Sequence, residues 1–341
     1  MHESRRASFE VPVLAGTREG VSWIGRLRRR LFAISSEETL PSRRGFAVED
    51  AATEARLARV GATFLAGYHA AMAETAAEPL ARHLDATVAV GWRGFAFEGA
   101  AFGLAILDAL TPWSRSRFDR FVSGPAAHHV YLAYVGLGWT FARLPRRIPP
   151  IVAGIDPHYR WLTLDGYGFH QGFFAWPAAV TRQEVPRRLS GYARRGFDQG
   201  LGRSLWFVRG GRPGAIATAI GAFAPERQAD LWSGIGLAAT YAGGVPEADL
   251  VQLGELAGNH RPHLAQGAAF AAEARVLAAD PTPELDLACR TIWGRSPAQL
   301  AEMTREFGRD LPADESARPA FEAWRERIRS EFYRSVEGSP L

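Results

Sequence analysis

A glycine that returns every 27 to 37 residues is the feature that most constrains how this chain can fold. A repeat of about 33 residues has room for two antiparallel helices, but not for a strand–helix–strand unit with loops of ordinary length. The spacing therefore predicts an all-α fold of tandem antiparallel helical hairpins, arranged as an α-solenoid or an α/α toroid. Eight glycines in similar local settings form the series: Gly67, Gly99, Gly136, Gly172, Gly200, Gly234, Gly267 and Gly294.

Prolines and glycines indicate where the helices begin and end. Proline recurs at positions suited to a first helical turn, as at Pro213 and Pro225, and paired glycines close several apolar stretches. Short helices should therefore alternate with long ones. Two successive units illustrate the plan, with helices expected over 213–223 and 225–242 and then over 246–257 and 262–279.

Charge divides the 341 residues into three parts. Residues 1–46 hold nine arginines and five acidic residues, so this segment accounts for the whole net charge of +4. The remainder is electrically balanced, and we therefore expect no nucleic-acid partner. We predict a basic N-terminal arm over 1–45, a helical-repeat domain over 46–295 and a charged, solvated C-terminal helical cap over 296–341.

The arm contains a short segment, Trp23 to Phe32 (WIGRLRRRLF), whose pattern predicts a basic amphipathic helix. The simpler interpretation is that this helix docks its Leu and Phe side chains on the first repeat. Binding to a membrane surface is the alternative, although helices of that kind usually present a longer apolar face.

The residue types that the chain lacks exclude several kinds of chemistry. All 40 basic residues are arginine, so no lysine can form a Schiff base or act as a general base. Cys289 is the only cysteine, which excludes an internal disulfide and a thiolate-rich metal site and fits a reducing cytoplasm. No metal-binding or nucleotide-binding motif is recognisable, and we expect no metal or other cofactor. We also expect neither a signal peptide nor a transmembrane span.

Polar residues stand directly before five of the repeat glycines. If the long helices line one side of the array, these side chains face the same space, where neighbouring aromatic residues would wall a cavity. The alternative is that they serve helix packing alone, because a buried amide can bond to a neighbouring helix. The candidate ligand-binding residues are Glu98, Gln171, Gln199, Ser233 and Gln266, with Phe169, Phe197 and Trp232 as walls.

Two titratable residues lie one position further back, His170 in GFHQG and Asp198 in GFDQG. An imidazole held beside a carboxylate can serve as acid and base near neutral pH, because the carboxylate raises the pKa of the imidazole. Asp165 and Arg203 would complete the polar cluster. His170 and Asp198 are therefore the candidate catalytic residues, and a buried structural pair is the alternative.

Several long strings in this chain resemble the UnbL family, whose biochemical activity is unassigned and whose genes lie beside an iterative polyketide synthase in enediyne clusters. These strings are GYGFHQG, ARRGFDQGLGRSLWF, ADLWSGIGLAATYAGG and RPHLAQGAAFAA, and the resemblance runs from about Leu27 to Ala301. It implies a role in building or processing a conjugated polyene or enediyne core, with a polyketide synthase as a possible partner. It supplies no catalytic residue to transfer.

The leading hypothesis is a cytoplasmic biosynthetic enzyme that binds a hydrophobic polyene in an aromatic helical cavity and acts on it by acid–base chemistry without a cofactor. A non-catalytic scaffold or carrier that serves the synthase is the rival hypothesis. Isoprenoid cyclisation is a further variant, although the acidic metal-binding motifs of diphosphate-dependent cyclases are missing. A closed aromatic pocket would favour an enzyme, and an open polar groove would favour a scaffold.

Overall fold

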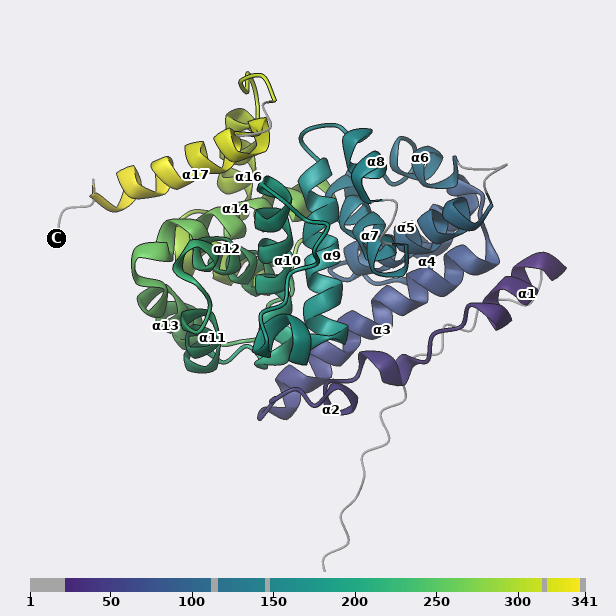
Figure 1. Cartoon of the computed structure of the whole chain (residues 1–341), viewed down its shortest axis with the longest axis horizontal. Coiled ribbons are helices and arrows are strands. Elements are labelled where there is room, and N and C mark those ends of the chain that lie inside the picture. The colour runs from purple at the N-terminus through teal and green to yellow at the C-terminus, as the bar shows by residue number, and fades with distance from the viewer. Residues whose placement is uncertain (1–21, 112–115, 145–147, 315–317, 338–341) are drawn as a thin grey trace, which may run out of the picture.

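Long helices follow one another through the chain and pack side by side (Figure 1). The structure is a computed structural model that describes residues 22–111, 116–144, 148–314 and 318–337, and its regular secondary structure within these ranges is helical throughout. Each long helix contacts the one before it and the one after it. They are α3 (Ala51–Ala73), α5 (Arg93–Leu110), α7 (Val130–Arg143), α9 (Arg160–Phe174), α10 (Tyr192–Val208), α12 (Pro225–Tyr241), α14 (Arg261–Leu277) and α16 (Pro297–Phe307).

Shorter helices connect the long ones and contact each other, as α4 does with α6 and as α11, α13 and α15 do in turn. Within the described residues this alternation confirms the predicted helical repeat. A π-helical turn, η4 (Pro177–Thr181), replaces the short helix between α9 and α10. The short helices are α4 (Ala77–Thr87), α6 (Arg117–Val122), α8 (Ile148–Ala153), α11 (Pro213–Gly221), α13 (Glu247–Ala257) and α15 (Pro283–Trp293), and single 3-10 turns, η2 (Ala127–His129) and η5 (Gly258–His260), precede α7 and α14.

Glycines make the close approach of neighbouring long helices possible. A Cβ atom on Gly200 of α10 would lie 1.7 Å from the backbone oxygen of Asp165 on α9, and one on Gly202 would lie 2.1 Å from that of Leu231 on α12. The first glycine of this Gly-x-Gly pair faces the preceding helix and the second faces the following helix. The pairs that begin at Gly136, Gly166 and Gly234 repeat the arrangement. Any side chain there would force the helices apart.

Two glycines of the predicted series, Gly172 and Gly294, do not contact the backbone of a neighbouring long helix. In α9 the glycine equivalent to Gly136 and Gly200 is Gly166, because its Cβ position meets the backbone oxygen of Val135, whereas that of Gly172 meets the Ser204 side chain. Gly294 lies in no long helix: it ends α15 with φ +67°, a left-handed conformation that suits glycine. The prediction was wrong at these two positions because local sequence similarity does not define which helix face a glycine occupies.

The row of long helices curves until α3 and the start of α5 meet the ends of α12 and α14. On α3, Arg56 Nε donates to the backbone oxygen of Ala242, 2.6 Å away, just after α12. Buried Arg275 on α14 donates to the backbone oxygen of Gly91 at 2.8 Å, just before α5. The rings of Phe95 and Tyr241, 5.3 Å apart, meet inside this junction. The helices therefore surround an interior, as the toroid alternative anticipated.

The N-terminal arm includes α1 (Trp23–Leu31), η1 (Ser36–Thr39) and α2 (Pro41–Arg44), while residues 1–21 lie outside the described residues. The predicted amphipathic helix is present, and Phe32 at its end packs against the core. The expectation that its leucines dock on the first repeat was wrong, because Leu27 and Leu31 are exposed. Gly25, which is buried, and Arg28, which is half-buried, face the protein instead.

The C-terminal part is less solvated than its charge suggested. α16 extends the row of long helices on α14, and α17 (Ala320–Glu337) lies across α14 and α16. Arg325 and Ile328 of α17 are fully buried. The expectation of a solvated cap was therefore wrong for these helices, and the three domain boundaries stay predictions. Among the described residues, no helix combines the length and apolar character that a membrane crossing requires.

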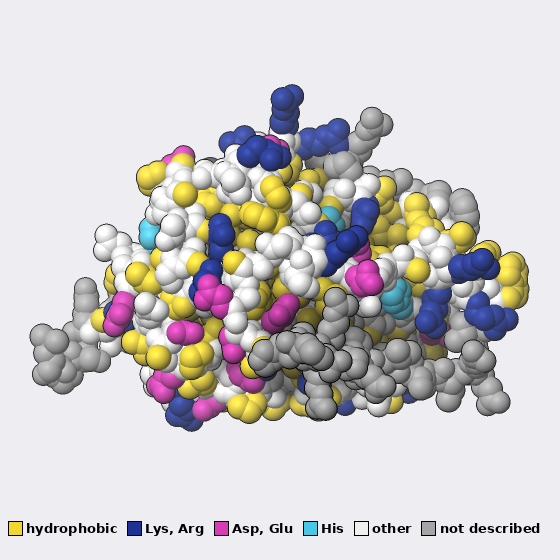
Figure 2. Space-filling view, turned by 90° about the horizontal axis from the view of Figure 1, so that it is seen from below, with side chains coloured by type: hydrophobic (Ala, Val, Ile, Leu, Met, Phe, Trp, Pro, Cys, Tyr) yellow, Lys and Arg dark blue, Asp and Glu magenta, His cyan; other side chains and the backbone are white. Residues whose placement is uncertain are grey.

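On the face seen in Figure 2, charged side chains of both signs are scattered among hydrophobic and neutral ones. This distribution agrees with the balanced charge of the sequence beyond the arm.

The helix contact at Gly200 can be tested by adding one methyl group. Gly200→Ala should lower the free energy of unfolding by about 2 kcal/mol or more, because the new Cβ would collide with a backbone oxygen that cannot move alone. Gly214→Ala is the matched control: this helical glycine of α11 has no atom within 4 Å of the Cβ position, so the change should be neutral or stabilising by under about 1 kcal/mol. Urea unfolding followed by circular dichroism measures both. Equal stability of the two variants would contradict the close contact.

Candidate functional site

The ring of long helices encloses a narrow apolar cavity of about 90 Å³. Residues from α3, α5, α7, α9, α10, α12 and α14 contribute to its wall. Aromatic rings dominate the wall, and two of them, Phe64 and Trp139, stack with centroids 4.2 Å apart. The aromatic lining residues are Phe64, Phe95, Tyr131, Trp139, Phe169, Phe173, Phe174, Phe207, Tyr241 and Phe270.

Nine wall residues occupy fixed sequence positions relative to the glycines at which neighbouring long helices touch, which we call the crossing glycines. On α7, α9, α10, α12 and α14, the residue three positions after the glycine that contacts the preceding helix lines the cavity, because it lies about one helical turn further along. The residue seven positions after the glycine continues the same stripe. The first set is Trp139, Phe169, Arg203, Leu237 and Phe270, and the second is Phe173, Phe207, Tyr241 and Ala274.

One carboxyl group faces this apolar space. Glu98 on α5 lines the cavity and is 4% exposed. Burial raises the pKa of Glu98 to about 7, because the charged form loses its hydration; nearby Arg203 and Trp139 oppose the shift, and nearby Asp165 adds to it. Glu98 can therefore give or take a proton near neutral pH.

Tyr241 supplies a second polar group to the cavity wall. Its buried hydroxyl makes no hydrogen bond within the described residues, and the space that it occupies exists because residue 94 is glycine. A buried hydroxyl without a partner costs free energy, so a ligand or water that bonds to it would be favoured. Burial also raises the pKa of Tyr241, which keeps the hydroxyl protonated and able to donate.

Arg203 completes the polar part of the wall. Its Nη1 lies 3.1 Å from Asp165 Oδ1, and both side chains are buried. Its guanidinium carbon lies 4.9 Å from the centre of the Phe169 ring, in the geometry of a cation–π contact. Arg203 thus brings one positive charge to the cavity, and Asp165 partly balances it from behind.

A second pocket of about 340 Å³ adjoins the cavity. Thr39, Phe64, Trp139 and Phe174 line both spaces. This second pocket, which we call the outer pocket, is more polar than the cavity. Its polar lining includes Arg44, Arg143, His170 and Gln171. The two spaces are therefore neighbours, one largely aromatic and the other more polar.

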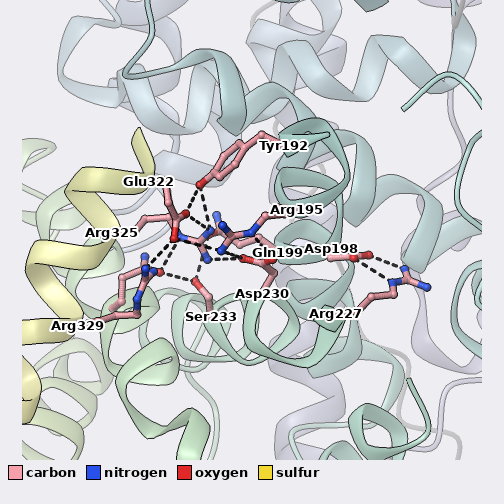
Figure 3. Close-up of polar contacts among 11 residues, drawn as sticks. Tyr192, Arg195, Asp198, Gln199, Arg227, Asp230, Ser233, Glu322, Arg325 and Arg329 are labelled. Carbon is pink, nitrogen blue, oxygen red and sulfur yellow. Dashed lines mark hydrogen bonds and ion pairs between the residues drawn. The ribbon is translucent and has the colours of Figure 1, made fainter. Parts of the chain in front are cut away.

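Behind the wall, the polar residues that precede the crossing glycines form a buried hydrogen-bonded chain (Figure 3). Gln199 Nε2 donates to Asp165 Oδ2 at 2.8 Å, and the Ser233 hydroxyl lies 3.1 Å from Gln199 Oε1 and 3.0 Å from Gln266 Oε1. Gln266 Oε1 also accepts from Arg325 Nε of α17 at 2.9 Å. These side chains satisfy one another across adjacent helices, and this supports the packing interpretation for Gln199, Ser233 and Gln266.

The hydrogen-bonded chain of side chains ends in a cluster of charged residues beneath α17. Arg325 Nη2 lies 2.7 Å from Asp230 Oδ1, and its Nη1 lies 3.2 Å from Glu322 Oε2. Although burial opposes the change, Arg325, Arg329 and Arg195 lower the pKa of Glu322 to about 2. Glu322 therefore stays ionised at neutral pH, and the ion pairs of Arg325 with Asp230 and Glu322 hold α17 on the ring.

The structure does not join the two residues that the sequence paired as acid and base. His170 lies in the outer pocket, where burial and the charges of Arg143 and Arg44 lower its pKa to about 3. Asp198 forms a two-pronged ion pair with Arg227, at 2.9 and 2.5 Å, and points away from the chain in Figure 3. Adjacent helices place these side chains on different faces, and no hydrogen bond or ion pair links them.

The other candidates divide by helix face. Phe169, Glu98 and Arg203 line the cavity, and Gln171 lines the outer pocket. Phe197 and Trp232 are buried in the core without lining either space. The sequence interpretation missed Trp139 and Tyr241 as wall residues. Their spacing of three and seven after a crossing glycine is the signal that could have found them.

The described residues contain no group of three or more His, Cys, Asp or Glu side chains that could hold a metal ion.

The raised pKa of Glu98 predicts a pH-dependent stability. Between the unfolded value near 4.5 and the folded value near 7, the folded protein binds more protons than the unfolded chain, so stability falls as the pH rises through this window. Glu98→Gln, which imitates the neutral acid, removes this loss. The variant's free energy of unfolding relative to the parent should rise between pH 5 and pH 8 by up to about 3 kcal/mol. Denaturant unfolding at several pH values measures this difference, and a constant difference would contradict the assignment.

Comparison with known proteins places the chain in a family. Neither a curated protein nor a solved structure matches it. Residues 23–332 match the model of a family described as a protein of unknown function, DUF1702. This segment begins at the start of α1, reaches into α17 and includes every residue of the cavity wall. Because the match covers most of the sequence, the chain belongs to the DUF1702 family.

Proposed function

We propose that this protein binds a long, apolar, polyene-like molecule that occupies the aromatic cavity and extends into the neighbouring outer pocket, and that Glu98 exchanges protons with it. The observation that carries the proposal is a carboxyl group with a pKa near 7 in a wall that is otherwise mostly aromatic and aliphatic. Apolar walls with a few polar groups are typical of small-molecule sites. A titratable acid inside such a wall is typical of sites that move protons.

The proposed chemistry is the migration of double bonds, with ring closure where the bound chain is folded suitably. The Glu98 carboxyl gives its proton to one alkene carbon and becomes a carboxylate, while the ligand becomes a cation that the surrounding rings stabilise through their faces. The cation then loses a proton from a different carbon to the same carboxylate. The acid is restored, atoms and electrons balance, and no oxidant or reductant is required.

The polar groups around Glu98 have complementary roles in this proposal. The Tyr241 hydroxyl orients a polar end or substituent of the ligand, because it has no protein partner within the described residues. Arg203 stabilises the carboxylate that forms after proton transfer, since it lies near enough to oppose the rise of the Glu98 pKa. The proton-transfer role assigned to His170 and Asp198 therefore passes to Glu98.

The resemblance to the UnbL family supports a polyene or enediyne intermediate as the ligand, within a biosynthetic pathway that includes a polyketide synthase. An apolar cavity would shield such a reactive chain from water. Protonation by a carboxylic acid in an aromatic pocket would also suit an isoprenoid chain, which is the cyclase variant. A carrier that only shelters its ligand would use the same cavity and leave Glu98 without a chemical role.

Binding can be tested with the conjugated tetraene parinaric acid, whose fluorescence rises when it leaves water. The parent should bind it, and Ala271→Phe, which fills the buried wall position of α14, should weaken binding at least tenfold. Ala248→Phe on the exposed face of α13 is the matched control and should bind as the parent does. If the parent fails to bind, or if both variants keep the parent's affinity, the cavity is not the site. Circular dichroism verifies that each variant is folded, and Ala238→Leu offers a milder filling of the same wall.

Proton exchange separates an enzyme from a carrier. In D2O, the parent should transfer deuterium to carbon atoms of the bound polyene, detected as a mass increase of the recovered molecule. Glu98→Gln should keep the affinity for parinaric acid within about twofold and lose deuterium transfer by more than about a hundredfold, because the amide cannot act as an acid. Binding by the parent without any deuterium transfer would refute the acid–base role and leave the carrier. Equal transfer by Glu98→Gln would assign the proton to another group.

A further inference from the structure

Helix α1 presents its apolar side away from the protein. Its hydrophobic residues Trp23, Ile24, Leu27 and Leu31 are 67%, 47%, 47% and 67% exposed. At 3.6 residues per turn these four positions fall within about 100° of one another on the helix. They form a continuous stripe, which we call the α1 stripe. A surface helix normally turns such a stripe toward the core.

The opposite side of α1 attaches the helix to the protein. Gly25 is buried, Arg28 is half-buried and Phe32 packs against the core, while α1 as a whole contacts α3. The attachment continues beyond the helix, because the Tyr68 hydroxyl donates to the backbone oxygen of Phe32 at 3.0 Å. This anchoring fixes the outward direction of the α1 stripe, so its exposure is a property of the fold.

Arginines border the stripe on both sides. In helical projection Arg30 lies next to Trp23, and Arg28 lies next to Ile24, with exposed Arg29 behind them. No acidic residue occurs between Trp23 and Leu31. Figure 2 shows basic and hydrophobic side chains beside one another at the end of the molecule where Figure 1 places α1. A partner for this surface must offer an apolar layer bordered by negative charge.

We propose that α1 docks the protein on the surface of a membrane that contains anionic lipids. A bilayer offers an apolar interior beneath negative headgroups, which matches a stripe of Trp, Ile and Leu bordered by arginine. Tryptophan also favours the boundary between headgroups and acyl chains. With only nine residues in α1, the binding is reversible and depends on the apolar stripe and the arginines together.

The position of α1 connects this docking to the cavity. Ile34, three residues after the helix, lines the outer pocket, and its backbone N–H donates to His69 Nε2 of α3 at 3.2 Å. If the proposed function holds, a docked α1 keeps the outer pocket near the bilayer that dissolves an apolar ligand. Membrane binding itself needs no ligand and is tested without one.

The test is cosedimentation of the full-length protein with phosphatidylglycerol–phosphatidylcholine vesicles, compared with vesicles of phosphatidylcholine alone. The parent should bind the anionic vesicles and leave the neutral ones largely free, and added salt should weaken binding. Leu27→Ser/Leu31→Ser should weaken it at least tenfold. Arg29→Gln/Arg30→Gln should weaken it by roughly fivefold for each charge removed.

The matched control is Val251→Ser/Leu256→Ser, which removes two comparably exposed apolar side chains from α13 and should bind as the parent does. Unchanged thermal unfolding verifies the fold of each variant. The proposal is overturned if the parent stays in solution with anionic vesicles, or if the α1 and α13 variants bind equally. It is also overturned if neither the parent nor any variant binds vesicles and the parent instead forms a dimer. Loss of that dimer only in Leu27→Ser/Leu31→Ser would assign the α1 stripe to self-association. A failure of parinaric acid binding would leave these results unaffected.

Discussion

The close contact of backbones at the crossing glycines is the constraint on which the rest of the structure depends. Because a Cβ atom at Gly200 or Gly234 would overlap a backbone oxygen, neighbouring long helices can approach this closely only where the contacting residue of one helix lacks a side chain. Repetition of this contact around the ring sets how narrow the interior is. The same contact sorts the remaining positions of each helix into a crossing face, a core face and a cavity face.

The crossing face and the cavity face have different chemistry for this reason. A residue beside a crossing is shut off from water, so its polar atoms must bond to the next helix, as Gln199 and Ser233 do. A residue one turn further on faces the cavity, where only another wall residue can cover it. Aromatic side chains fill that face and make the interior apolar. Glu98 differs from Gln199 because its helix neighbour at the equivalent position is Val135, which offers no hydrogen bond.

Much of the fold follows from the sequence, and the site follows from it less completely. The all-α repeat, the long helices near 225–242 and 262–279 and the buried position of Gln199, Ser233 and Gln266 were predictable from glycine, proline and apolar spacing. The register of α9 was not, because GFHQG resembles GFDQG more closely than DGYG does. That choice put Gln171 in place of Asp165 in the buried chain. It also hid the set of wall residues that follow the crossing glycines by three and seven.

The sequence by itself determined that helices of two lengths alternate and that small residues recur where the long ones meet, since both properties are local. Only the tertiary structure decided that the row closes, that Glu98 titrates near neutral pH and that the α1 stripe faces outward. Closure depends on contacts between residues far apart in the chain, such as Arg56 with Ala242. The pKa of Glu98 depends on how completely all the surrounding helices exclude water. The direction of the α1 stripe depends on which side of the helix finds a place on α3, and amphipathic spacing is the same for either side.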